Sequence, residues 1–139
     1  MISLDAAREM IAKAREKGRE LELKPLSVAV LDAGGHLLAF EREDGSSPGR
    51  FEIARGKAYG AVMLGMPGSA QMARAEQQAY FMAAVNGAFE GRVVPVPGGV
   101  LIKQDGAVIG AIGVTGDTSD NDALAAVAGV EAAGFEALA

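Results

Sequence analysis

The residues best suited to chemistry lie in two parts of the chain. Arg50 and Lys57 are seven positions apart, about two turns of a helix, so both cations project from one helical face. Paired cations can hold a carboxylate, although a solvent-exposed helix face is the more ordinary explanation. Thr115 stands where the last long strand should give way to a helix, a junction that combines free backbone amides with a hydroxyl. Asp122 follows as a candidate general acid or base.

The single histidine and the glycine pairs have both a structural and a functional interpretation. His36 follows Gly34-Gly35 at the start of a strand and is expected to be a partly exposed turn residue. Zinc sites need three or four ligands and no partner has ligand spacing, so no metal site is expected. Gly98-Gly99 could bring backbone amides to a ligand, but both glycine pairs are also explained as turns. Arg42 lies among Glu41, Glu43 and Asp44, where a local ion pair is the simplest expectation.

Hydrophobic patterns predict helices and hairpins around these residues. Apolar residues from Leu4 to Ala14 share one helical face, and Gly18 is expected to end that helix. Two apolar runs, Leu26–Leu31 and His36–Phe40, flank the turn Asp32-Ala33-Gly34-Gly35 and predict a hairpin.

Later parts of the chain repeat this alternation. Ser47 and Pro48 should be the N-cap and first residue of a second helix, and a further helix is expected over about Ser69–Phe89. Arg92–Gly99 reads as a loop or irregular edge strand. The predicted second hairpin turns at Asp105-Gly106, between Val100–Gln104 and Ala107–Val114. Ser119 and Asp122 form a capping box for the last helix, which is expected to include Phe135 and Leu138. Two hairpins separated by helices indicate an α+β fold with one antiparallel sheet.

Composition limits the class of protein. A chain of 139 residues, half of them hydrophobic, fits a single domain over 1–139. The net charge of −5 and the lack of a basic run argue against nucleic acid and anionic membranes as partners. With no cysteine, no signal-peptide pattern and no membrane-length apolar run, the protein is expected to be cytoplasmic.

Several motifs together resemble one family. They are VAVLDAGGHLLAFEREDG, ARGKAYGA, PGGVLIKQDGAVIGAIGVTG and SDNDALAAVAG, preceded by the helix SLDAAREMIAKA. In this order they resemble the GlcG/HbpS-like proteins, also found as the C-terminal domain of PduO-type proteins, from Ser3 to about Ala128. The resemblance implies a profilin-like fold, a five-stranded antiparallel sheet flanked by helices, assembled as dimers or larger rings. Some members of the family bind haem.

The resemblance also carries over residue by residue. Arg42 takes the place of an arginine in the family's R-M-D-G motif, and Lys57 matches a lysine whose usual following threonine is absent here. Gly98 and Gly99 match a glycine pair, Thr115 a Ser/Thr position, and Asp122 an acidic position. These residues are expected to face a ligand cleft.

Three functional hypotheses follow. The first is an oligomeric small-ligand-binding protein for haem or a related tetrapyrrole, whose acid groups Arg50 and Lys57 would hold. His36 is the only histidine for iron, with Tyr59, Tyr80, Met63 and Met66 as substitutes. The second is an enzyme acting on a small carboxylate or hydroxylated intermediate, with Lys57 or Asp122 as acid or base and Thr115 orienting the substrate. The third is a structural or regulatory partner without a ligand.

Overall fold

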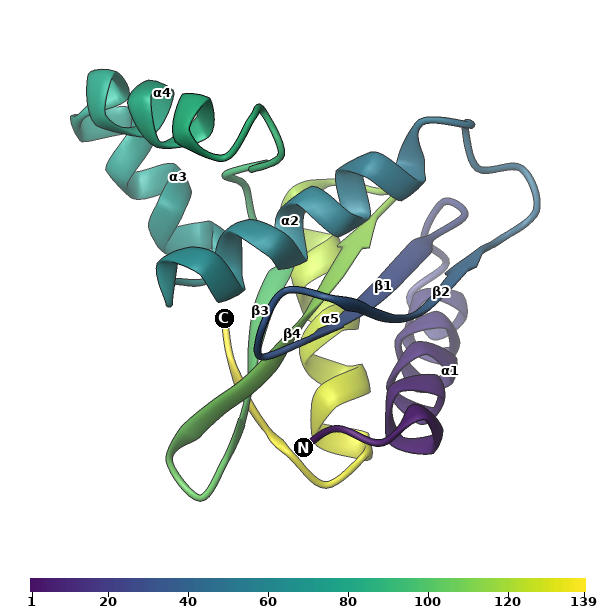
Figure 1. Ribbon diagram of the computed structural model, residues 1–139. Helices are drawn as coiled ribbons and strands as arrows, with labels where there is room; N and C mark the ends of the chain where they lie inside the picture. Colours follow the sequence, from purple (N-terminus) through teal and green to yellow (C-terminus); the bar gives the residue numbers. More distant parts are fainter.

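The computed structural model describes residues 1–139, which form five helices and five strands (Figure 1). In chain order these are α1 (Leu4–Glu20), β1 (Ser27–Asp32), β2 (Leu37–Arg42), α2 (Arg50–Leu64), α3 (Gly68–Gln77), α4 (Ala79–Ala88), β3 (Gly99–Gln104), β4 (Ala107–Thr115), α5 (Ser119–Ala132) and β5 (Glu136–Leu138). None of the helices is long and apolar enough to cross a membrane.

The strands form a single antiparallel sheet in the order β2-β1-β4-β3-β5. Both predicted hairpins are present, as β1–β2 and β3–β4. Helices α1 and α5 cover one face of the sheet, α2 crosses the other face, and α3 and α4 project as an arm (Figure 1). The predicted α+β fold with a five-stranded antiparallel sheet is therefore confirmed.

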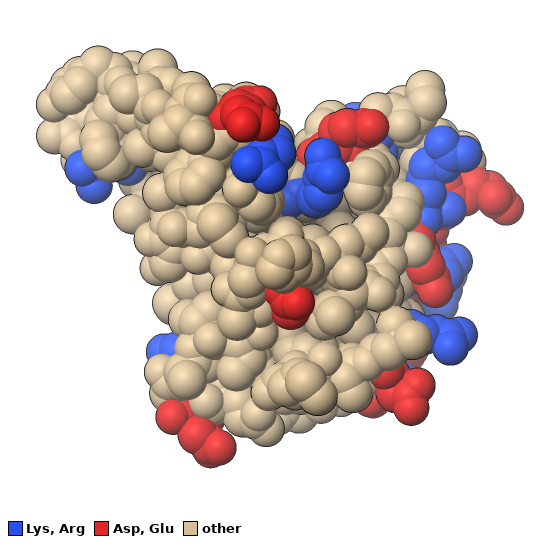
Figure 2. Space-filling model, in the orientation of Figure 1, with Lys and Arg blue, Asp and Glu red and all other residues tan.

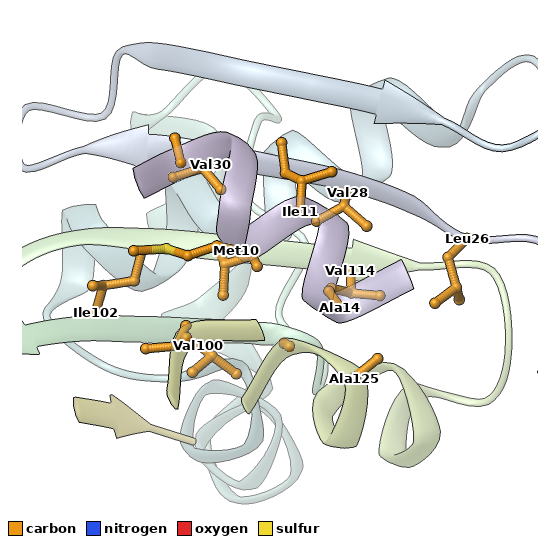
Figure 3. Close-up of a cluster of buried hydrophobic side chains, with 14 of the residues drawn as sticks. Met10, Ile11, Ala14, Leu26, Val28, Val30, Val100, Ile102, Val114 and Ala125 are labelled. Atoms are coloured by element: carbon orange, nitrogen blue, oxygen red, sulfur yellow. The ribbon is translucent and has the colours of Figure 1, made fainter. Parts of the chain in front are cut away.

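The main core lies between the sheet and the α1–α5 layer (Figure 3). Met10, Ile11 and Ala14 follow one face of α1 and are fully buried. Burial of each large side chain of this kind stabilises the fold by about 1.5–3 kcal/mol. Gly18 does not end α1, which continues to Glu20. A Cβ at Gly18 would lie 2.6 Å from Leu26 Cδ1, so this glycine permits close packing inside the helix.

Helix α2 rests directly on the opposite face of the sheet. A Cβ at Gly113 would collide with the Ala54 carbonyl oxygen, and one at Gly99 with the Lys57 carbonyl. These glycines let the backbones of helix and sheet approach closely. Ala54 and Ala58, on the face of α2 that meets the sheet, are fully buried. Phe51, which the hydrophobic periodicity placed on the same face, is only half-buried.

Two predicted helix boundaries were wrong, because turns interrupt the helix where the hydrophobic periodicity alone would continue it. Helix α2 begins at Arg50 and not at Pro48, because Ser47 accepts the Arg50 N–H through its carbonyl (3.3 Å) and Gly49 is the N-cap. The helix expected over Ser69–Phe89 is two helices, broken where Gln78 adopts φ −137° and ψ 64°.

The C-terminal region also differs from the prediction. Thr118, and not Ser119, caps α5, since its hydroxyl accepts the Asn121 N–H at 3.3 Å. The helix ends at Ala132, and Leu138 lies in β5, paired with Leu101 of β3. The loop expected over Arg92–Gly99 is present, with β3 beginning at Gly99.

Candidate functional site

A buried ion pair joins the inner face of α2 to the start of α5. Lys57 Nζ donates to Asp122 Oδ2 (3.1 Å) and to the Val114 carbonyl (2.9 Å). Lys57 and Asp122 are 2% and 1% exposed. Burial lowers the pKa of Lys57; the Asp122 carboxylate opposes this effect, and Arg50 adds to it. Asp122 Oδ1 also accepts the Asp117 N–H at 2.9 Å, so this carboxylate orders the turn before α5 and is not part of the predicted capping box.

The glycine pair Gly98-Gly99 makes room for this lysine. Both glycines are buried, and a Cβ at Gly98 would lie 2.9 Å from Lys57 Nζ. Neither glycine, nor Lys57, nor Asp122 lines any of the hollows in the surface. These four residues pack together where α2, the sheet and the start of α5 meet. A ligand-binding role for them remains a prediction.

Arg50 and Thr115 meet at the end of the same sheet face. Arg50 Nη1 donates to Thr115 Oγ1 (2.8 Å), and Arg50 Nε donates to Ser47 Oγ (3.2 Å). Arg42 lies on this face as well, because its register partner Ser27 is also the partner of Thr115. Arg42 is exposed and within 4.0 Å of no carboxylate, so the local ion pair expected there is absent.

The two glutamates beside Arg42 are engaged elsewhere. Arg15 forms ion pairs with Glu41 (2.5 Å) and Glu43 (3.1 Å), and Glu43 also accepts the Leu26 N–H (2.6 Å). These contacts tie α1 to the β2 end of the sheet. They could not be foreseen from residues adjacent in sequence, because Arg15 is 26 and 28 positions away.

A polar hollow of about 240 Å³ opens beside Arg50. It is lined by Lys24, Pro25, Gly45, Ser46, Ser47, Arg50 and Gly116, so Pro25 contributes the one apolar side chain. The Ser46 hydroxyl is buried and has no hydrogen-bond partner, and the same holds for the fully buried Ser27 on the neighbouring strand. Sequence reasoning identified Arg50 but missed Lys24 and Ser46, which only the fold brings to α2.

The outer face of α2 carries a row of aromatic and arginine side chains. Phe51, Arg55 and Tyr59 are spaced by four residues and therefore lie along one stripe. The Arg55 guanidinium lies 5.1 Å from the Phe51 ring centre, and that of Arg92 lies 4.5 Å from the Tyr59 ring centre. We call Phe51, Arg55, Tyr59 and Arg92 the outer row.

Further aromatic contacts extend the outer row at both ends. Phe40 of β2 packs edge-on against Phe51 with 4.8 Å between ring centres, and Phe89 packs against Tyr59 at 5.8 Å. Neither Arg55 nor Arg92 has a carboxylate within 4.0 Å. In the space-filling view, basic side chains gather over α2, in the notch between the arm and the body (Figure 2). The four-residue spacing could have revealed this stripe from the sequence.

The β1–β2 turn lies beside the outer row. A Cβ at Gly35 would be 2.6 Å from Met63 Cε and 3.4 Å from the Tyr59 ring, so both side chains pack against the turn. The His36 side chain is 81% exposed, and its Nδ1 lies 3.2 Å from Asp32 Oδ1. The turn role predicted for His36 is thus confirmed. Hydrogen bonds from the backbone N–H groups of His36 and Gly34 lower the pKa of Asp32.

The other proposed iron ligands are less favourably placed. Tyr80 is 73% exposed on α4, in the arm, and Met66 is half-buried in the turn between α2 and α3. No group of three or more His, Cys, Asp or Glu side chains is arranged to hold a metal ion.

The sheet order, the flanking helices and the sites on both sides of α2 define a small α+β protein with a profilin-like arrangement. A family model described as "Haem degrading protein HbpS-like" matches residues 2–131. The chain belongs to the HbpS-like family, as the motif resemblance predicted.

Relatives and solved structures agree with this assignment. Protein GlcG of Escherichia coli K12 is 33% identical over 119 residues, which cover 83% of this chain and 81% of GlcG. A crystal structure of an HbpS double mutant from Streptomyces reticuli superposes with a TM-score of 0.80 and 30% identity, covering 94% of this chain and 85% of the other. The crystal structure of a PduOC:heme complex has the same fold, with a TM-score of 0.87, 23% identity and coverage of 99% and 98%.

Proposed function

We propose that this protein binds haem, or a related planar tetrapyrrole with acid groups, on the outer row of α2. The observation that carries this proposal is the outer row itself, where two arginines without carboxylate partners flank two aromatic rings. A planar, largely apolar molecule with carboxylates at its edge matches such a surface. The guanidinium groups that lie over the Phe51 and Tyr59 rings would turn to pair with its acids, and the ring faces that they leave would stack on the molecule. The HbpS-like family and the heme complex of PduOC support the same ligand class.

The residues around the β1–β2 turn fit an iron-bearing ligand. A carboxylate beside one histidine nitrogen fixes the tautomer and leaves the other nitrogen free to ligate a metal. Asp32 stands in that relation to His36 Nδ1, and the ring is exposed. Tyr59 and Met63, which pack against the same turn, offer alternative ligand types. Haem would supply iron chemistry here, while the protein would position the ligand and hold its acid groups through Arg55 and Arg92.

The monomer leaves such a ligand open to solvent, and this supports an oligomer. The hollows of one chain measure about 280, 240 and 230 Å³, at or below the lower end of the range for small-molecule pockets. Helix α4 has no charged residue and exposes Tyr80 (73%) and Phe81 (36%). An exposed apolar surface of this kind is typical of an interface, and we assign its partner as a second copy of the chain. Sedimentation of the apo-protein should give a mass of at least two chains of 14.2 kDa each. The mass of a single chain would refute this assignment.

No comparable observation favours acid–base catalysis. Lys57 and Asp122 are almost fully buried and line no hollow, so a substrate has no visible route to them.

The test is a haem titration of the purified apo-protein, followed by the Soret band. We expect saturable binding, a spectral change in His36→Ala that reports the lost iron ligand, and about 2- to 5-fold weaker binding in Arg55→Gln, the loss expected for one partly exposed charge contact. Arg74→Gln is the matched control, because Arg74 stacks on the Phe81 ring in the arm at 4.2 Å, away from the outer row. A linear, non-saturating response, or equal affinities for Arg55→Gln and Arg74→Gln, would refute the proposal.

A further inference from the structure

We infer that the polar hollow beside Arg50 is a second binding site, specific for a small anion that presents negatively charged oxygens, such as a carboxylate or phosphate group. It opens on the Gly45–Ser47 and Lys24–Pro25 loops, whereas the outer row lies along α2. The inference is therefore independent of haem binding, and either can fail without the other.

Arg50 has unused donor capacity in this hollow. A guanidinium carries five N–H donors, and Arg50 uses two of them, toward Thr115 and Ser47. These two neutral hydroxyls hold the side chain in place without neutralising its charge. No carboxylate lies within 4.0 Å of Arg50. A fixed guanidinium with free N–H groups at the wall of a hollow is the arrangement that binds carboxylate and phosphate oxygens.

Ser46, one of the lining residues, carries an orphaned hydroxyl. Ser46 Oγ is buried and has no hydrogen-bond partner, an arrangement that costs free energy unless something satisfies the hydroxyl. A rotation about the Ser46 Cα–Cβ bond would turn the hydroxyl toward the hollow, where an anionic oxygen would accept its hydrogen bond. Lys24 also lines the hollow. The N-cap of α2, Gly49, provides no side-chain cap, so the first helical N–H groups add to the positive potential there.

Two of the nearby carboxylates, those of Asp117 and Glu43, are already engaged. Asp117 accepts the Lys24 N–H (2.9 Å), the Thr118 N–H (2.9 Å) and the Asn121 amide (2.8 Å), while Glu43 is held by Arg15 and the Leu26 N–H. Glu52 lies in the first turn of α2 but is exposed. None of them forms an ion pair within 4.0 Å with Arg50 or Lys24. The Lys24 charge does act on Asp117 at longer range, so Arg50 is the cation most available to an external anion.

The size and lining of the hollow define the ligand class. Its volume of about 240 Å³ lies below the usual range for small-molecule pockets, which suits an acid of a few heavy atoms. Pro25 is the one apolar side chain in the lining, so a large apolar ring would gain little by entering. A small organic acid and inorganic phosphate share the chemistry that this wall recognises.

The experiment titrates the apo-protein with sodium acetate, sodium malonate and inorganic phosphate at constant ionic strength, following amide chemical shifts or heat. We expect saturable binding of at least one of the three, with shifts centred on Ser46, Ser47 and Arg50. Arg50→Gln should weaken it by about 10- to 100-fold, the loss expected for a charged hydrogen bond. Ser46→Ala, which removes the orphaned hydroxyl without touching the Arg50 contacts, should weaken it by about 3- to 10-fold. Arg74→Gln, in the arm and away from both sites, is the matched control and should leave it unchanged.

The outcomes separate this inference from the haem proposal. Tighter binding of phosphate than of the two carboxylates identifies a phosphorylated ligand, and the reverse order identifies an organic acid. Failure of all three anions to saturate, or equal loss in Arg50→Gln and Arg74→Gln, would overturn the inference. Arg50→Gln should leave haem affinity at the wild-type value; a parallel loss of haem binding would show that the two sites are one.

Discussion

Replacing Lys57 by methionine tests whether the buried ion pair supports the fold. Methionine retains most of the apolar side-chain length but removes the ammonium group, leaving the Asp122 carboxylate at 1% exposure without its partner. The Val114 carbonyl also loses its lysine donor. Breaking a buried pair on one side leaves an uncompensated charge and costs about 3–5 kcal/mol. At about 3 °C per kcal/mol for a domain of this size, this corresponds to a lowering of Tm by roughly 10–15 °C.

The assay is urea unfolding followed by circular dichroism, repeated for Asp122→Asn and for the double variant. The side-chain carbonyl introduced by Asp122→Asn would still accept the Asp117 N–H, so the double variant keeps this hydrogen bond and has neither buried charge. We expect it to be more stable than Lys57→Met alone by about 1–2 kcal/mol. The coupling energy from the double-mutant cycle should exceed this difference by the cost of Asp122→Asn alone. Arg55→Gln is the surface control and should lie within about 0.5 kcal/mol of wild type.

The pH dependence adds a second readout of the same pair. Burial lowers the pKa of Lys57 below 10.5, so above the folded-state pKa the unfolded chain binds more protons than the folded one. Wild-type stability should therefore rise relative to Lys57→Met as pH increases through that window toward 10.5. A Lys57→Met protein within about 1 kcal/mol of wild type at about pH 7, with no coupling to Asp122→Asn, would refute the assignment of this lysine as a buried support.

Two further predictions concern the start of α5. Thr118→Ala should destabilise the protein by about 1 kcal/mol, the usual cost of losing an N-cap, whereas Ser119→Ala should change stability little; the opposite order in urea unfolding would contradict the observed cap. Hydrogen bonds from Asn121, Lys24 and Thr118 lower the pKa of Asp117 to about 2, so this carboxylate stabilises the fold above about pH 4 and loses that effect as pH falls toward 2. The stability difference between wild type and Asp117→Asn should shrink over that range, and a difference independent of pH would contradict the assigned contacts.

Local signals were sufficient for much of the fold. The Asp105-Gly106 turn was predictable because both residues adopt positive φ (52° and 80°), which Asp-Gly supplies in a two-residue hairpin. The α1 core face and the β1–β2 hairpin followed from apolar spacing in the same way. The break at Gln78 was not predictable, because no proline or glycine marks it. Strand β5 was missed because three residues that pair with distant β3 carry no local strand signal.

The candidate site was predictable in composition but not in arrangement. Arg50 and Lys57 were expected to act together on one helix face. In the structure, Lys57 belongs to the buried stripe of Ala54, Ala58 and Ala61, a spacing that could have placed it inward. Arg50 faces a hollow built by loops far away in sequence, and its partner Thr115 is 65 positions distant. Such long-range contacts depend on sheet order, which sequence periodicity does not contain.

The projecting arm has a consequence for local unfolding. Helices α3 and α4 pack chiefly on each other and meet the body through α2, β3 and the loop before β3. Helix α4 buries a single side chain, that of Met82. Segments with so few buried contacts open at a small fraction of the global unfolding free energy. Amide hydrogens of α4 should thus exchange early in an isolated chain, while those of β1 and β4 at the sheet centre exchange last. Slow exchange in α4 would report that another surface covers it, so exchange rates there measure assembly in solution at the level of single residues.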